Sequence, residues 1–265
     1  MNQRKDRALW SFLLWIKYIE MLRGYRCDLH VHTCLSPCGD LDMYPSAVVE
    51  KAIAEKLDII AICDHNASEN IQFVMRSAEG KPLTVLPGME ITSSEEVHVL
   101  ALFDTLDDLK KIQDIIYQNL SGMNREEIFG CQAIVNDLDE VEGFNDRFLL
   151  GATRLSLHDV IQHVHRFGGL VIASHIDRES FSVISQLGFI DPDIPFDALE
   201  ITHQTGIRNA RLKYPELSRY PLVESSDAHF IRDIGQGVTN FFLEKGTVSE
   251  LKMAFEHRGG RYIQE

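Results

Sequence analysis

From Cys27 onward the sequence alternates between short apolar runs and amphipathic stretches, and this alternation limits the folds open to the chain. Runs such as 58–63 and 170–174 are typical of buried strands, and stretches such as 106–120 between them are typical of helices. Repeated strand–helix units of this length predict an α/β fold with a mainly parallel sheet and helices outside it. Six or seven such units in one run favour a closed barrel over an open sheet.

The segment 121–153 interrupts this alternation. Two short apolar runs flank the turn-like pair Asn136-Asp137, so we expect a hairpin insertion here. Long irregular connections in compact domains tend to be functional. We therefore expect the insertion to border the active site and to restrict which substrates enter.

The rest of the chain contains no linker rich in Pro, Gly or Ser, so residues 27–265 are expected to form one domain. Residues 1–26 are expected to be a helical extension. Its apolar part, 8–22, is interrupted by Lys17 and Glu20 and is too short for a membrane span. This segment also lacks the small-residue cleavage site of a signal peptide. An amphipathic helix packed on the domain or on a partner chain is the first interpretation, and a helix on a membrane surface is the alternative.

Charge and cysteine content narrow the classes of partner. The formal net charge is −14, from 26 Lys and Arg against 40 Asp and Glu, and such a surface repels a long polyanion. We therefore expect no long nucleic acid as a partner.

Five cysteines, an odd number without an export signal, point to a reducing compartment, so a cytoplasmic location is expected. Nothing in the sequence specifies an oligomeric state.

Histidines and carboxylates stand at the predicted strand ends, where the active sites of parallel α/β folds form. One histidine at such a position is more often structural than a ligand, and one aspartate before a helix is usually an N-cap. Here, however, six of the eleven histidines occupy strand ends together with two carboxylates, which favours a metal site. The residues are His30, His32, His65, Glu90, His98, His175, Asp227 and His229.

The spacing of these residues supports chelation. Residues separated by one position on a strand point to the same face, so His30 and His32 can bind one ion, and Asp227 and His229 share this spacing. The two carboxylate oxygens of Glu90 can bridge two cations, which an imidazole cannot do. Imidazole and carboxylate ligands without thiolates suit zinc, manganese or iron, so we expect two or three of these divalent ions.

Taken in order, the motifs resemble those of the PHP (polymerase and histidinol phosphatase) domain family. They are DLHVHT at 28–33, CDH at 63–65, PGME at 87–90, EVHVLALF at 96–103, ASH at 173–175 and SSDAH at 225–229. The resemblance covers Cys27 to the C-terminus. It implies a distorted (β/α)7 barrel of PHP type, here with a hairpin insertion, and the activity of a stand-alone metal-dependent phosphoesterase.

The resemblance also implies a set of metal ligands. The first ion would have four: His30, His32, Glu90 and Asp227. Glu90 would bridge to a second ion, which His98 and His175 would hold. Among these ligands, Glu90, His175 and Asp227 are expected to be catalytic.

A third ion would lie among Asp40, His65 and His229. Here the sequence departs from the family, because the common Ser-Asp-Gly after the first motif is replaced by SPCGD at 36–40. The carboxylate is therefore displaced along the chain. Asp40 is therefore predicted as the ligand in preference to Asp42 or Cys38.

The ligand set predicts hydrolysis of a phosphate ester by a metal-activated water. Arg178 and Asn66 are candidates for substrate contact, although a solvated arginine and a helix cap explain them equally well. Asp28 and Asp64 are expected to orient ligand imidazoles. The expected substrate is a small phosphorylated molecule, such as a nucleotide or sugar phosphate, or a short oligonucleotide.

Two other classes use similar ligands. A metal-dependent amidohydrolase usually adds a metal-bridging lysine, and no lysine stands at a predicted strand end. A non-catalytic PHP domain serving a partner protein is the other alternative, and the nearly full ligand set argues against it.

Overall fold

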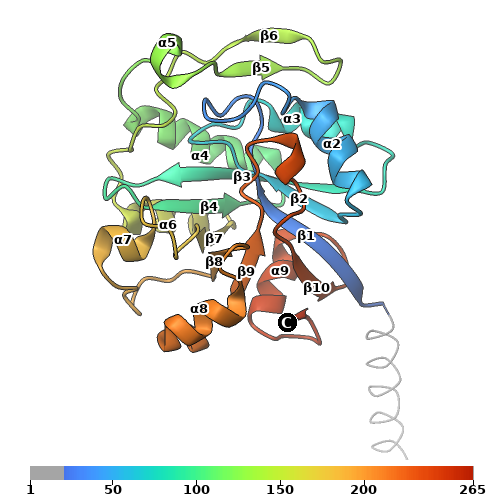
Figure 1. Ribbon diagram of the computed structural model, residues 1–265, viewed down its shortest axis with the longest axis vertical. Helices are drawn as coiled ribbons and strands as arrows, with labels where there is room; N and C mark the ends of the chain where they lie inside the picture. The colour runs from blue at the N-terminus through green and yellow to red at the C-terminus, as the bar shows by residue number, and fades with distance from the viewer. Residues whose placement is uncertain (1–20, 265) are drawn as a thin grey trace, which may run out of the picture.

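Seven strands of the computed structural model curl into a distorted barrel, with helices around it (Figure 1). The structure describes residues 21–264. Its main sheet has nine strands in the order β11-β10-β1-β2-β3-β4-β7-β8-β9. The barrel strands are β1 (Arg23–Val31), β2 (Ile59–Ile62), β3 (Thr84–Thr92), β4 (His98–Leu102), β7 (Leu170–Ala173), β8 (Ala198–Thr202) and β9 (Leu222–Ser225). The predicted α/β fold with a distorted seven-stranded barrel is confirmed.

The direction of β4 differs from the expected crossover pattern. β4 pairs antiparallel with both β3 and β7, whereas the other neighbouring barrel strands are parallel. Only residues 93–97 join β3 to β4, too few for the helical crossover that a parallel neighbour needs. Because β4 is reversed, its first residue, His98, lies at the edge where the parallel strands end.

The barrel closes where the chain returns from β9 to β1. Val31, at the end of β1, forms a parallel bridge with Ala228. At its start β1 instead pairs with β10 (Thr239–Leu243), which in turn pairs with β11 (Tyr262–Gln264). The Thr239 hydroxyl joins β10 to β9, since it accepts from the Glu224 backbone N–H at 2.8 Å and donates to the Glu224 carbonyl at 2.9 Å.

The sheet separates the core into two clusters of buried apolar side chains, both of which are covered by helices. These helices are α2 (Pro45–Ala54), α3 (Ile71–Ser77), α4 (Leu106–Asn119), α6 (Leu157–Arg166), α7 (Val183–Leu187), α8 (Ile207–Lys213) and α9 (Val248–Phe255). One cluster lies between the sheet and the outer helices and includes Ile60, Val99 and Ile161. The other fills the barrel, where Leu29 and Leu100 pack with Leu251 of α9, so α9 closes the end opposite the strand-end histidines.

The predicted hairpin insertion is present (Figure 1). It consists of β5 (Ala133–Val135) and β6 (Val141–Phe144), preceded by the short helix α5 (Glu126–Phe129). The side chain of Asn70, next to α3, fixes the hairpin, because it donates to the Ala133 carbonyl and accepts from the Val135 N–H, each at 3.0 Å.

Some expected boundaries change. β1 begins at Arg23 rather than at Cys27, so residues 23–26 belong to the barrel sheet. The expected helix within residues 1–26 lies almost entirely in 1–20, outside the described residues. Helix α8 and two 3-10 helices, η1 (Pro215–Arg219) and η2 (Ile231–Asp233), were not predicted. No helix within residues 21–264 is long and apolar enough to cross a membrane.

A buried ion pair ties the last strand to α9. Arg261, only 1% exposed, binds Glu250 through Nε and Nη2 at 2.9 and 2.8 Å and binds Glu244 at 2.7 Å. Glu250 is itself buried. The buried charges of Arg261 and Glu250 therefore depend on one another, whereas the Glu244 side chain is 26% exposed and can also meet water.

Replacing Arg261 with alanine should lower the free energy of unfolding by about 3–5 kcal/mol, because Glu250 would stay buried without its partner. Arg258→Ala is the control, since its side chain is 65% exposed and its ion pair with Glu256 contributes little. Urea denaturation of both variants measures the difference. Equal stability of the two variants would show that the Arg261 pair does not anchor this end of the barrel.

Candidate metal centre

The strand-end histidines and carboxylates meet at one edge of the barrel. The structure brings together eight of the nine residues predicted as ligands, around a cavity of about 330 Å³. They come from the ends of β1, β2, β3, β7 and β9 and from the start of the reversed strand β4. The eight are His30, His32, His65, Glu90, His98, His175, Asp227 and His229.

Hydrogen bonds behind the first two histidines fix their tautomers. The Ser36 hydroxyl donates its proton to Asp64 at 2.7 Å, so it must accept at 2.9 Å from Nδ1–H of His32. His30 likewise donates its Nδ1–H to the carboxylate of Glu200, at 3.1 Å from Oε2. Both rings therefore turn Nε2, the nitrogen available to a metal, toward the cavity.

At this point four potential ligand atoms converge. The Nε2 atoms of His30 and His32 are 3.1 Å apart, and Asp227 Oδ1 lies 3.2 and 3.1 Å from them. Glu90 Oε2 lies 3.5 Å from each Nε2. One proton can bridge only two of these atoms, whereas one divalent ion can bind all four. The donor set therefore fits a metal ion.

The charges around this group favour the charged forms of both His30 and Glu90. Burial alone would lower the pKa of His30, but the charges of Asp227, Glu200 and Glu90 outweigh burial and raise it well above its usual value. Burial alone would raise the pKa of Glu90, but His98, His30 and His65 hold it well below its usual value. Without a metal, a proton on His30 thus supplies the positive charge that the carboxylates require.

Glu90 faces a different set of imidazoles with each oxygen. Oε1 lies 3.0 Å from Nδ1 of His98 and 3.2 Å from Nε2 of His175. Oε2 faces His30 and His32 and lies 3.0 Å from Nδ1 of His65. Nδ1 of His175, a residue only 3% exposed, has no hydrogen-bond partner among the described residues. The carboxylate is thus placed between two groups of candidate ligands.

Two candidate ligands stand in a strained backbone conformation. His175 and Asp227 have φ angles of 29° and 50°, in the left-handed region that residues other than glycine rarely adopt. Such strain persists where the surrounding structure fixes it, and it clusters at functional sites. Asp28 contributes to this fixation, because it accepts the backbone N–H groups of Ser226 and Gly235 at 3.0 and 2.9 Å. Asp28 therefore orients the turn beyond β9, not an imidazole as expected.

Asp40 is the predicted ligand that the structure does not bring to the centre. Asp40 is exposed, and its carboxylate accepts a hydrogen bond from the backbone N–H of Asp42 at 3.0 Å. Cys38 lines the cavity instead, together with His65 and His229. Burial raises the pKa of the Cys38 thiol, but the charge of His65 and the polar interactions with His229 and His65 lower it to about 6.

Glu200 is a site residue that the sequence interpretation missed. It is 1% exposed, and besides binding His30 it accepts the backbone N–H of His175 at 2.9 Å. Asp64, which was expected to orient an imidazole, does so through Ser36. The signal for Glu200 is alternation in ALEIT at 198–202, which places Glu200 on the same face as Ala198, inside the barrel.

The two predicted substrate contacts have different positions. Arg178 lines the cavity, and its Nη2 lies 2.6 Å from Asp227 Oδ2. Asn66 is fully buried, and its amide binds the carbonyls of Leu149 and Gly151 and the N–H of Thr92. All the hydrogen bonds recorded for the Asn66 side chain thus go to backbone groups, so the structure gives Asn66 a structural position away from the cavity.

Apolar side chains form the rim of the cavity. Phe181 stacks on His98 with ring centroids 4.6 Å apart, and its carbonyl accepts the backbone N–H of His98 at 2.9 Å. Leu150, from the end of the insertion segment 121–153, lines the same cavity. The insertion therefore borders the site, as expected from its place in the sequence.

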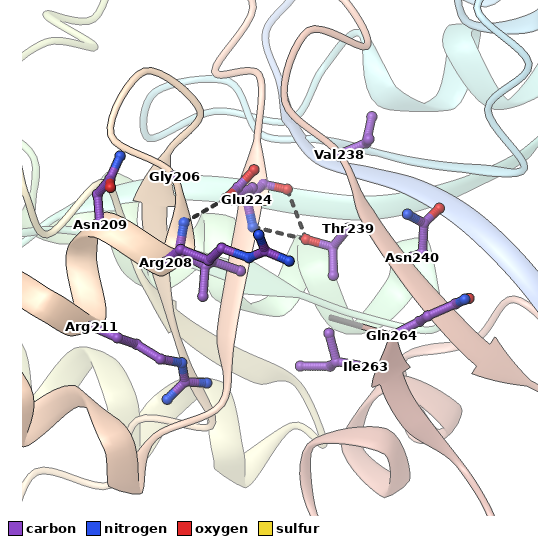
Figure 2. Close-up of a pocket in the computed structure, with 11 residues that line it drawn as sticks. Gly206, Arg208, Asn209, Arg211, Glu224, Val238, Thr239, Asn240, Ile263 and Gln264 are labelled. Carbon is purple, nitrogen blue, oxygen red and sulfur yellow. Dashed lines mark hydrogen bonds between the residues drawn. The ribbon is translucent and has the colours of Figure 1, made fainter.

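A larger cavity, of about 470 Å³, lies outside the barrel between α8 and strands β9, β10 and β11 (Figure 2). Figure 2 shows Glu224 and Arg208 on its wall; the Glu224 carboxylate accepts the backbone N–H of Ile207 at 2.6 Å. No histidine lines this cavity, and none of the metal-ligand groups found among the described residues lies in it. The chemistry is therefore concentrated at the smaller cavity.

Comparison with known proteins agrees with this geometry. The PHP domain model matches residues 28–210, and the PHP-associated model matches 213–258. An uncharacterized protein of Methanocaldococcus jannaschii is 24% identical over 234 residues, which cover 82% of this chain and 70% of that protein.

Two solved structures share the fold. Endonuclease Q of Pyrococcus furiosus, described as lesion-specific, matches with a TM-score of 0.70 and 16% identity over 91% of this chain. This chain spans only 58% of that endonuclease. A Bifidobacterium adolescentis protein assigned as a metal-dependent phosphoesterase matches with a TM-score of 0.52 and 20% identity, over 77% of this chain and 87% of that one.

The PHP domain model covers more than half of the chain, and the matched region carries six of the eight converging histidines and carboxylates. The chain therefore belongs to the PHP domain family.

Proposed function

We propose that the protein is a phosphoesterase that hydrolyses a small phosphorylated molecule at a centre of two or three divalent ions. The observation that carries this proposal is the position of Glu90 between two groups of imidazoles, one facing each carboxylate oxygen. Paired ions held by one bridging carboxylate suit displacement at phosphorus, because both the attacking and the leaving oxygen need positive charge.

In this proposal the first ion is held by four ligands: His30, His32, Glu90 and Asp227. The second is held by Glu90 with His98 and His175. Zinc, manganese and iron all suit these oxygen and nitrogen ligands. Bound divalent ions would supply the charge that lowers the pKa of a water and binds phosphate oxygens.

The other side chains prepare the site for this chemistry. Glu200 and Ser36 keep the Nδ1 protons of the first two histidines, so that both Nε2 atoms stay free for a metal. Arg178 is held at the cavity by Asp227 and supplies a guanidinium for a phosphate group. Phe181 and Leu150 form an apolar rim that limits access of bulk water.

The surroundings favour a small substrate. A second cavity of about 330 Å³ adjoins the first, and both are lined by Cys38, Arg178, Asp227 and His229. Among the described residues that line them, Arg178 is the only Lys or Arg. The hairpin at 133–144 carries four carboxylates and no Lys or Arg. A long phosphate backbone would find few cations here.

A nucleic acid is the second candidate substrate. The fold resemblance to endonuclease Q favours it, since another structure of that enzyme is a complex with a 27-mer duplex carrying an abasic lesion at the active site. The net charge of −14 and the single arginine at the cavities favour the small molecule.

A substrate panel separates the two candidates. The protein loaded with zinc or manganese is assayed with nucleoside monophosphates, sugar phosphates, short oligonucleotides and a duplex with an abasic site. We expect turnover of a phosphomonoester or a short oligonucleotide. Cleavage of the duplex alone would support the nucleic-acid candidate, and no turnover of any phosphate ester would contradict the proposed function.

Glu90→Gln should abolish hydrolysis and lower the metal content, because an amide lacks the charge and the second anionic oxygen that hold two ions. Glu96→Gln, an exposed residue in the connection between β3 and β4, is the matched control and should behave like the unchanged protein. Elemental analysis and turnover are measured together. Full metal content with normal turnover in Glu90→Gln would show that Glu90 is not the bridge.

Metal binding should release protons and weaken as the pH falls. The raised pKa of His30 means that its imidazole is protonated at neutral pH without a metal, and that proton must leave before Nε2 can bind. Titration calorimetry of zinc in two buffers of different ionisation enthalpy measures the proton count. Heats that are independent of the buffer would show that His30 is already neutral.

A further inference from the structure

The loop that follows β1 places a thiol where a carboxylate was expected. The sequence SPCGD at 36–40 turns tightly, with the N–H of Ser36 bound to the Thr33 carbonyl at 3.1 Å and that of Gly39 bound to the Ser36 carbonyl at 2.8 Å. A Cβ at position 39 would lie 2.7 Å from the Thr33 oxygen, so only glycine fits. The turn directs Cys38 into both cavities of the site.

The same turn keeps Asp40 from the centre. Its backbone N–H donates to the His229 carbonyl at 2.8 Å, while its carboxylate accepts from Asp42. The chain beside His229 is therefore fixed by the backbone of Asp40, and the side chain that reaches the histidines is that of Cys38.

Two histidines face this thiol with nitrogens suited to a metal. His229 donates its Nδ1–H to the Asp227 carbonyl at 2.8 Å, which leaves Nε2 as an acceptor. His65 is only 6% exposed, and its Nδ1 has no aligned hydrogen bond, although Glu90 Oε2 is 3.0 Å away. Ring nitrogens of His65, His229 and His32 all lie within 4.8 Å of one another. Ring nitrogens that converge in this way can offer their lone pairs to a shared cation.

We propose that Cys38, with His65 and His229, binds the third ion of the centre, and that this site selects zinc over manganese. The proposal rests on the proposed function, because it adds an ion to the same centre. A thiolate is a soft ligand that zinc accepts and manganese does not favour. One sulfur and two nitrogens leave one tetrahedral position open, as in catalytic zinc sites. On binding, the S–H bond breaks, its electron pair forms the S–Zn bond, and the proton passes to solvent.

The site has a consequence for thiol chemistry. Cys38 is exposed enough to meet a reagent, whereas Cys27, Cys34 and Cys63 are buried. A thiolate bound to zinc is a poorer nucleophile than a free one, so zinc should protect Cys38 from alkylation. Cys131 is partly exposed in the insertion and lies outside the cavity lining, so its reaction is an internal control.

The first experiment follows alkylation by iodoacetamide, with peptide mass spectrometry to separate Cys38 from Cys131. With free zinc ten times above its dissociation constant, Cys38 should react roughly tenfold more slowly, since only the unbound fraction reacts. The rate at Cys131 should not change. Equal rates at Cys38 with and without zinc would overturn the proposal.

The second experiment uses cobalt as a spectroscopic probe. The cobalt-loaded protein should show thiolate-to-cobalt charge-transfer absorption, which Cys38→Ser removes together with about one ion per chain, while Asp40→Asn keeps both. Loss of an ion in Asp40→Asn with none lost in Cys38→Ser would assign the site to Asp40. A protein that binds two ions and hydrolyses phosphate esters with a free Cys38 would overturn this inference alone, whereas absence of all metal binding would overturn the proposed function.

Discussion

The site depends on one constraint, the burial of the Glu90 carboxylate among imidazoles at the mouth of the barrel. Glu90 is 1% exposed, and five histidines have a ring nitrogen within 3.5 Å of its oxygens. A carboxylate so far from water requires compensating positive charge. His30 and His65, whose pKa values this environment raises, supply it without metal, and in our account divalent ions replace their protons.

Much of the surrounding structure serves to hold this arrangement. The reversal of β4 brings His98 to the same edge as the ends of the parallel strands. Glu200 and Ser36 hold the first two imidazoles from behind, and Asp28 fixes the strained turn that carries Asp227. Removing one of these supports would leave the ligands present but free to rotate, which weakens metal binding without changing the ligand count.

The sequence predicts the parts of the site that depend on strand periodicity. His30-x-His32 and Asp227-x-His229 share faces because side chains alternate along extended chain, and the same rule places the histidines at strand ends. The reversed direction of β4 was not predicted, because the apolar pattern of a strand does not indicate whether it runs parallel or antiparallel to its neighbours. Asp40 was preferred over Cys38 because a linear spacing does not show how tightly the loop turns at Gly39.

Other misjudged residues depend on long-range contacts. Asn66 was interpreted as a substrate contact or helix cap, but its partners are Leu149, Gly151 and Thr92, which the sequence does not place beside it. Glu200 was not predicted as a site residue. A single acidic residue in an apolar strand can be recognised as one only when it is known which face of the strand points into the barrel. The local sequence pattern therefore predicts which side chains face the site, and tertiary packing decides which of them are in contact with one another.

The insertion and the surface charge shape what can reach the centre. Leu150 and Phe181 close its rim, and the acidic hairpin at 133–144 makes the approach of a polyanion unfavourable. The fold shared with endonuclease Q shows that such a barrel also serves in an enzyme whose substrate is DNA. Differences in the charge and loops around such a barrel thus offer a physical route to different substrates.

The most direct test of the central claim is the number of metal ions bound per chain. Elemental analysis of the protein after zinc loading and dialysis measures it. Our account predicts at least two ions, because Glu90 joins two separate groups of ligands. Fewer than one ion per chain, with no uptake on titration, would contradict it and leave protons as the only charge that holds the buried carboxylate.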